Sequence, residues 1–379
     1  MRPVFRMLLI VATISLSCVG ARAEEGSHYF PGAVSSFTDT LPVNLGSSTI
    51  GVANDSIYYH GSSNVLHTNA TTYTNSWALL YQFPGAISFL PGKPQYSVAL
   101  GVPYTWLNVH TSVQISKKVF VPLKFTDNGF GDVAMFPFML GWSKVEHECL
   151  GSSETSTLKY VLKYQTQLGV YAPTGDFDKN SLARVGRNFW TFEPGAAVSF
   201  LRVKWGLIPM HPLIPLVFEP TVSAGFDFNT KNGTTHYQTG DQFHLDGTMA
   251  VFMPVDTVGS AIGAGVSGFF YQQITGDTGR GATRGSFEAM TTGVGPDLSF
   301  VTGFCKLCKL SLAAEVKWLP ELSVSNRLQG NAVWFKLAFS WGEKIKDPPC
   351  PGTKAFAAGA APAAPLSAAM RSLYAISSF

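Results

Sequence analysis

Hydrophobic and polar side chains alternate with a period of two along several long segments of the chain. In residues 157–171, Leu158, Leu162 and other apolar residues share one face, and Lys159 and Lys163 occupy the opposite face. Successive side chains of a β-strand point to opposite faces, so this pattern predicts an amphipathic strand. The same alternation runs through residues 218–228, 243–251, 310–318 and 333–341.

The predicted strands are long, and turn-rich gaps of alternating length separate them. Ordinary strands average about five or six residues, whereas membrane-crossing strands need about 9–11. Further strands are predicted near residues 51–60, 77–83, 96–111 and 131–142. Short periplasmic turns and long extracellular loops are typical of outer-membrane proteins. The chain is therefore predicted to be all-β, a transmembrane antiparallel β-barrel of about 12 strands with both termini in the periplasm.

The composition agrees with this fold and excludes several other classes. Apolar residues make up 46% of the chain, while charged residues and aromatic residues make up 13% each. Such a chain is neither intrinsically disordered nor a coiled coil, and it is not a basic nucleic-acid binder. No apolar run after the N-terminal leader is long enough for a transmembrane helix, which needs about 20 residues.

The two ends of the chain differ from the predicted barrel. Residues 1–23 combine Arg2 and Arg6, an apolar stretch and an Ala-Arg-Ala site, and are predicted to be a cleaved signal peptide. The barrel domain is assigned to residues 24–341, and the Ala/Pro-rich residues 342–379 are predicted to be a flexible tail. Of the 27 basic residues, three arginines belong to the leader, which leaves 24 against 24 acidic residues. The mature chain is thus balanced in charge and favours no polyanionic partner.

The alternation of side chains within the strands assigns a set of charged residues to the barrel interior. Both signs are present, so the lumen carries no large field of one sign that would select one kind of ion. Opposite charges across a narrow lumen would pair and constrict it, which suits a small, weakly charged solute. The alternative is that these charges only neutralise one another inside a closed barrel. The predicted lumen-lining residues are Lys159, Lys163, Glu193, Glu219, Asp227, His244, Asp246, Glu288, Glu315, Lys317 and Lys336.

The cysteines offer three alternatives. Cys305 and Cys308 form a CxxC motif, which lies in a short turn between two predicted strands. A redox site needs a thioredoxin-like context that is missing here, so a local disulfide is the favoured interpretation. A zinc site would need a second ligand pair, for which His147 and Cys149 are the weak candidates.

Candidates for enzymatic chemistry are few. No Gly-x-Ser-x-Gly motif occurs, but His244 and Asp246 share a strand face, with Ser223 or Ser286 available as a nucleophile and Glu219 or Glu288 as an acid. A polar lumen lining explains the same residues, because barrel interiors are polar. The sequence therefore predicts no catalytic residue, no cofactor and no metal.

Several segments resemble one protein family. They are GDVAMFPFMLGW at 131–142, YAPTGDFDKN at 171–180, GRNFWTFEP at 186–194, FDFNTKNGTTHYQTGDQFHLD at 226–246 and HYFPG at 28–32. These motifs resemble the outer-membrane proteins of the MetA-pathway of phenol degradation family. The resemblance implies an outer-membrane barrel that passes aromatic or other hydrophobic compounds.

Two functional hypotheses follow. The first is a passive channel whose partners are outer-membrane lipid, a small hydrophobic or aromatic solute and, during insertion, the barrel-assembly machinery. Phe177, His236 and Tyr237 in two predicted extracellular loops would gather the solute, or would pack inside the loops themselves. The second is an outer-membrane-embedded lipid-modifying enzyme, and a structural barrel without transport is a further alternative.

Overall fold

Twelve long strands form the wall of the molecule. The computed structural model describes residues 27–33, 48–63, 67–116, 119–149, 157–179, 181, 183–205, 207, 215–255, 260–280, 282, 288–305 and 310–342. The wall strands are β1 (Thr49–Ser63), β2 (Thr68–Ala86), β3 (Gln95–Ser116), β5 (Val133–Glu148), β6 (Thr157–Ala172), β7 (Thr191–Lys204), β8 (Leu216–Asn229), β10 (Gln242–Pro254), β11 (Ala261–Gln273), β13 (Met290–Cys305), β14 (Leu310–Ser325) and β15 (Gln329–Trp341).

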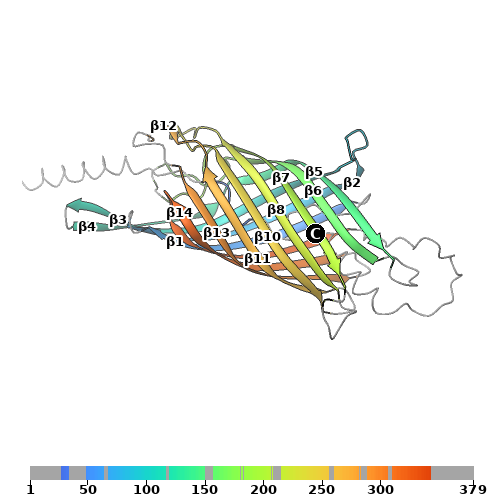
Figure 1. Ribbon diagram of the computed structural model, residues 1–379. Helices are drawn as coiled ribbons and strands as arrows, with labels where there is room; N and C mark the ends of the chain where they lie inside the picture. The colour runs from blue at the N-terminus through green and yellow to red at the C-terminus, as the bar shows by residue number, and fades with distance from the viewer. Residues whose placement is uncertain are drawn as a thin grey trace, which may run out of the picture.

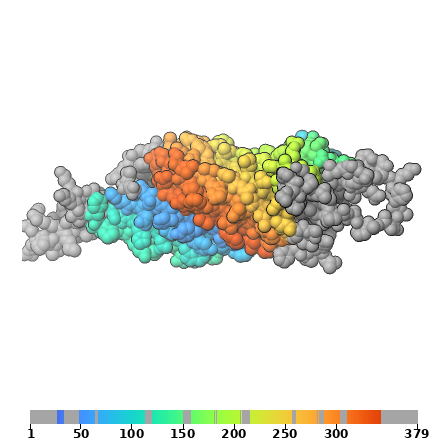
Figure 2. All heavy atoms as spheres, turned by 60° about the horizontal axis from the view of Figure 1, so that its bottom comes forward, coloured from blue at the N-terminus to red at the C-terminus, as the bar shows by residue number. Residues whose placement is uncertain are grey.

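The sheet closes on itself. Each wall strand pairs antiparallel with its neighbours, and β1 returns to pair with β15, with Ile50 opposite Trp341 and Ser62 opposite Gln329. In the space-filling view the blue start of the wall lies against the orange-red strands of its end (Figure 2). Closure satisfies the hydrogen bonds of both edges, which is the condition for a sheet that spans a membrane. The prediction of an antiparallel barrel of about 12 strands is confirmed.

The three longest connections lie at the same end of the barrel. At the end we call the loop end, residues 173–190, 230–241 and 274–289 connect the strands. At the other end, the turn end, shorter connections such as residues 255–260 and 306–309 join them. The predicted signal peptide, residues 1–23, and the predicted tail from residue 343 onward lie outside the described residues.

The pair β3 and β4 (Val119–Phe130) extends beyond the barrel and was not predicted. Residues 95–101 of β3 pair with β5, whereas residues 104–116 pair with β4, so the same strand changes its neighbour along its length. The resulting hairpin projects past the loop end of the wall (Figure 1). The sequence pattern predicted one strand over residues 96–111 but not its partner.

Side chains alternate between the two surfaces of the wall. Along β10, His244, Asp246 and Thr248 are buried, whereas Leu245 and Met249 between them are exposed. Met249 is 62% exposed and is one of many large apolar side chains on the outer surface. An apolar exterior around a polar interior is the arrangement that lipid requires, and the molecule is an outer-membrane β-barrel. Among the described residues, no helix is long and apolar enough to cross a membrane, which says nothing of a β-barrel.

Candidate functional site

The inward-facing side chains form three layers along the barrel. The first, near the turn end, is apolar: it includes Val217, Phe252 and Val301, which are fully buried. The second is charged and lies in the middle of the wall. The third, near the loop end, contains Glu193, Asp227, His244 and Asp246 together with a segment of the N-terminus. The lumen is therefore filled rather than open along its described length.

The N-terminal segment Ser27–Ala33, which we call the plug, lies inside the barrel. The two ring nitrogens of His28 contact the wall, with Nε2 2.8 Å from Asp132 Oδ2 and Nδ1 2.7 Å from Thr191 Oγ1. The Ser27 hydroxyl donates a hydrogen bond of 2.5 Å to Gln242 Oε1. These contacts fix the first residues of the plug near the loop end.

Tyr29 and Gly32 attach the plug to a single carboxylate of β10. The Tyr29 hydroxyl donates to Asp246 Oδ2 at 2.8 Å, and the Gly32 amide donates to Asp246 Oδ1 at 2.9 Å. The Tyr29 ring stacks on His244, with 4.0 Å between ring centroids, and lies parallel to Tyr271 at 5.8 Å. The plug is thus held by polar contacts at its backbone and by aromatic contacts at Tyr29.

Two lysines of the charged layer bind the C-terminal end of the plug. Lys317 Nζ donates to the carbonyl of Gly32 at 2.7 Å, and Lys336 Nζ donates to the carbonyl of Ala33. Gly32 has a φ of +82°, and a Cβ atom there would lie 2.1 Å from Leu319 Cδ1. Glycine is therefore required at this position for both conformation and space.

Nine of the residues predicted to line the lumen are buried inside the barrel. They are Lys163, Glu193, Glu219, Asp227, His244, Asp246, Glu315, Lys317 and Lys336. Their charges mix, as the sequence indicated: Lys317 Nζ lies 3.7 Å from Glu315 Oε2, and Lys336 Nζ lies 3.9 Å from Asp55 Oδ1. That any of them contacts a passing solute stays a prediction.

Two predicted lumen residues are placed elsewhere. In the pairing of β5 with β6, Tyr160 is opposite Glu146 and Leu158 is opposite His147, so Lys159 is an extra, bulged residue. Its side chain is 40% exposed and pairs with Glu146 at 3.0 Å. Glu288 is exposed and precedes the first residue of β13. The inward assignment from side-chain alternation was wrong for both residues, because alternation holds only inside a regular strand.

The loop aromatics differ in their surroundings. Tyr237 is only 2% exposed, and its hydroxyl donates to Asp277, so it packs within the loops and is not available to gather a solute. The strands β9 (Tyr237–Gln238) and β12 (Thr278–Gly279) pair and join the two loops that carry them. His236 is exposed, and Phe177 lies under the guanidinium of Arg184.

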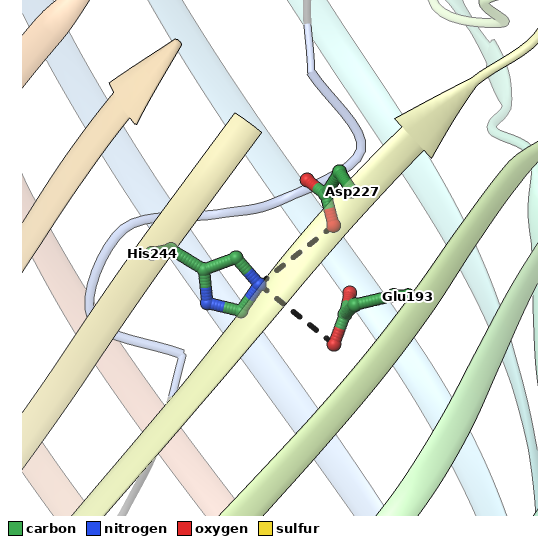
Figure 3. A group of neighbouring side chains, drawn as sticks. All are labelled: Glu193, Asp227 and His244. Carbon is green, nitrogen blue, oxygen red and sulfur yellow. Dashed lines mark ion pairs between the residues drawn. The ribbon is translucent and has the colours of Figure 1, made fainter. Parts of the chain in front are cut away.

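Glu193, Asp227 and His244 form a compact buried group in the plug layer (Figure 3). They come from β7, β8 and β10, three neighbouring strands, and their donor atoms lie within 4.8 Å of one another. His244 Nε2 is 3.7 Å from Asp227 Oδ1 and 3.9 Å from Glu193 Oε1. A nitrogen and two carboxylate oxygens are a donor set able to hold a metal ion.

The same histidine lacks the surroundings of a Ser/His/acid site. Neither ring nitrogen of His244 forms a hydrogen bond with a hydroxyl group among the described residues. Asp246 Oδ2 lies 3.7 Å from Nδ1, too far for the hydrogen bond that orients a catalytic imidazole. Ser286, one alternative nucleophile, lies outside the described residues. The geometry that the enzyme hypothesis needs is not found in this part of the chain.

The cysteine predictions fall largely on residues that are not described. Cys149 is disulfide-bonded, so its sulfur is not a free ligand for the alternative zinc site. Cys308 and the side chain of Cys305 lie outside the described residues. The local disulfide between Cys305 and Cys308 therefore stays a prediction.

The plug is the feature that sequence reasoning missed. Residues 28–32 were noted only as the HYFPG motif of the family resemblance. That motif gave no indication that the segment turns into the lumen. The available signal was chemical, because a histidine, a tyrosine and a glycine in a short segment before the first strand can bind a polar barrel interior. The alternation of inward and outward side chains could not reveal the plug, because this segment is not a strand.

Comparisons with known proteins bear on the whole barrel. A family model described as "Putative MetA-pathway of phenol degradation" matches residues 54–337. No curated protein matches the chain. Among solved structures, the COG4313 outer membrane channel from Pseudomonas putida F1 is 15% identical, with a TM-score of 0.47, and the match covers 80% of this chain and 98% of that one. The transport unit of the autotransporter AIDA-I from Escherichia coli is 10% identical, with a TM-score of 0.43 and coverage of 81% and 94%.

Proposed function

Since the chain belongs to the family described as "Putative MetA-pathway of phenol degradation", we propose that it gives small aromatic or hydrophobic compounds a passive path across the outer membrane. The observation that carries the proposal is the docked plug. It fills the polar end of the lumen through hydrogen bonds and ring stacking. Contacts of this kind can be broken and remade, so the plug can be displaced without covalent chemistry.

The plug layer offers aromatic surface to an apolar solute. Tyr29 and Tyr271 lie parallel in the lumen, and His28 stacks on Tyr171 with its edge against Phe189. Aromatic faces bind one another in stacked or edge-to-face arrangements at such distances. A phenol-like ring entering at the loop end, which we place outside the cell, would compete with Tyr29 and His28 for these partners.

Mixed charges below the plug favour a solute without net charge. Glu219, Glu315, Lys163 and Lys317 are buried and of both signs, so neither cations nor anions gain a continuous path of favourable field. The hydroxyl of Ser199 donates a hydrogen bond of 3.2 Å to Glu219, so one carboxylate oxygen of this layer has its partner within the wall. Passage therefore requires the plug and the charged layer to rearrange together.

The test is solute flux through the purified protein. Proteoliposomes with the full chain should take up phenol and longer apolar solutes faster than protein-free liposomes. The Tyr29→Ala/Asp246→Ala variant, which releases the plug, should raise that flux further. Glu219→Gln, which leaves every plug contact intact, is the matched control. Flux equal to that of protein-free liposomes for both the wild type and the plug-released variant, with the barrel correctly inserted, would mean that the barrel is structural and not a channel.

A further inference from the structure

We propose that Glu193, Asp227 and His244 form a binding site for a divalent transition-metal cation of the zinc class, inside the lumen and next to the plug. The three side chains project from β7, β8 and β10 towards a common point (Figure 3). The site is independent of the proposed transport: a barrel can bind the cation without passing a solute, and can pass a solute without the cation.

The spacing of the donors fits a shared cation better than direct contact. His244 Nε2 is 3.7 Å from Asp227 Oδ1 and 3.9 Å from Glu193 Oε1. Hydrogen bonds between nitrogen and oxygen are about 2.7–3.2 Å long, so neither pair is hydrogen-bonded. Zinc lies about 2.0–2.2 Å from imidazole nitrogen and carboxylate oxygen, which places two ligands of one tetrahedral ion roughly 3.3–3.6 Å apart, slightly less than the two distances found here.

Buried polar atoms in the group lack hydrogen bonds. Asp227 is 1% exposed and His244 is 5% exposed. Among the described residues, neither carboxylate oxygen of Asp227 nor either ring nitrogen of His244 has a hydrogen-bond partner. Buried polar groups are nearly always satisfied, and a buried carboxylate without a partner is strongly destabilising. A cation at their common point would satisfy Asp227 and His244 at once.

The charge of the layer also calls for a cation. Three carboxylates, those of Glu193, Asp227 and Asp246, lie within 4 Å of the imidazole of His244. One imidazolium would leave two negative charges uncompensated in a buried place. Two lysines of the lumen are engaged elsewhere: Lys317 contacts Gly32 and Glu315, and Lys336 contacts Ala33 and Asp55.

The wall is shaped to direct His244 towards the two acids. Gly225 lies opposite His244 in the register of β8 and β10. A Cβ atom on Gly225 would lie 2.5 Å from both Cε1 and Nε2 of the imidazole. The missing side chain therefore lets the ring lie across β8, with Nε2 pointing towards Glu193 and Asp227.

Neighbouring groups orient the ligands. The Tyr171 hydroxyl donates to Glu193 Oε2 at 2.8 Å, which leaves Oε1 directed at the histidine. Asp246 Oδ2 lies 3.7 Å from Nδ1, the ring nitrogen that does not face Glu193 and Asp227. The Tyr29 ring covers the imidazole face, so the plug lies directly over the site.

The donor set determines the class of ion. Magnesium and calcium favour sites made of oxygen alone, whereas imidazole favours zinc and its neighbours in the first transition series. One nitrogen and two carboxylates therefore indicate Zn²⁺, with Co²⁺ as a spectroscopic substitute. Three protein donors leave a position for water.

The experiment measures metal binding by the full-length barrel in detergent after treatment with a chelator. Isothermal titration with Zn²⁺ should give about one saturable site per barrel, with protons released on binding. His244→Ala and Asp227→Asn should each weaken binding at least about 10-fold. Glu219→Gln, a buried inward acid on the same strand as Asp227 but in the charged layer, should bind like the wild type.

A further variant separates the site from folding defects. Gly225→Ala keeps all three ligands but displaces the imidazole, so it should weaken Zn²⁺ binding while the barrel still shows heat-dependent mobility on a gel. Glu193→Gln serves the same purpose if His244→Ala fails to assemble. The proposal is overturned if the wild type shows no saturable site, which is the result expected if His244 is only a counter-ion. It is also overturned if the ligand variants that assemble bind Zn²⁺ with unchanged affinity.

Discussion

The Tyr29 hydroxyl donates a hydrogen bond of 2.8 Å to Asp246 Oδ2, which joins the N-terminal plug to wall strand β10. The other oxygen of the same carboxylate accepts from the Gly32 amide. Asp246 is 1% exposed, so both bonds lie away from water. One side chain of the wall therefore holds the plug at two points and makes docking sensitive to a single substitution.

Removal of that carboxylate should release the plug. Hydrogen bonds to a charged group contribute about 1.5–3 kcal/mol each, and Asp246→Ala removes two of them. We expect cleavage of residues 27–33 by an added protease to accelerate at least about 10-fold, since 1.4 kcal/mol corresponds to a factor of ten. Asp297→Ala is the control, because Asp297 is buried and accepts from Ser267 without touching the plug. Equal cleavage rates in both variants would show that Asp246 does not hold the plug.

Gly32→Ala should weaken docking through the backbone and through contact with the wall. A residue other than glycine at a φ of +82° is strained by about 1–3 kcal/mol, and the added Cβ would collide with Leu319. Hydrogen exchange at the amides of the plug should become faster, while exchange in the wall strands stays unchanged. Gly233→Ala, in an open loop position with no atom within 4 Å of the added carbon, should have no effect. The prediction fails if exchange in the plug is the same for both variants.

The contact between His28 and Asp132 makes docking depend on pH. Burial lowers the pKa of His28, which stays below its usual value although the hydrogen bond and charge of Asp132 raise it. Burial raises the pKa of Asp132, but the hydrogen bond and charge of His28, with the backbone amides of Arg187 and Gly175, hold it below its usual value. The docked plug therefore favours neutral His28 and ionised Asp132.

A lowered histidine pKa places the stabilising effect at the higher pH. Neutral His28 stabilises the docked plug above its free pKa of about 6.5, and this stabilisation is lost as the pH falls. The stabilisation from ionised Asp132 is lost only below about pH 3.8. Protease accessibility of the plug should therefore rise between about pH 7 and pH 5. His28→Gln should flatten this profile. An unchanged profile in His28→Gln would assign the effect to a group other than His28.

A charge on the outer face should prevent assembly, whereas a change inside should not. Phe335 is 44% exposed on the outer face of β15, and its neighbour Lys336 is buried in the lumen. Phe335→Arg meets hydrocarbon at about 2–4 kcal/mol near the bilayer midplane. We expect a large loss of heat-modifiable barrel in membranes for Phe335→Arg and near-normal yield for Lys336→Gln. Similar yields would reverse the assignment of the two faces.

The sequence by itself determined the wall of this protein. Alternation within a strand is a local property, because each side chain faces away from its neighbour, and so the inward set containing His244 and Asp246 could be read directly. The same rule failed at Lys159, where a bulge in the pairing with β5 shifts the parity, and at Glu288, which lies outside the strand. Neither irregularity follows from hydrophobicity.

The tertiary structure alone decided what the lumen contains. Tyr29 and Asp246 are 217 positions apart in the chain, and only barrel closure brings β10 next to the returning N-terminal segment. Likewise, Glu193, Asp227 and His244 meet because the antiparallel register aligns three strands, with Gly225 leaving room for the imidazole. A periodic pattern states which face a residue is on, but not its distance from a residue on another strand. The plug and the candidate metal site therefore required the folded barrel.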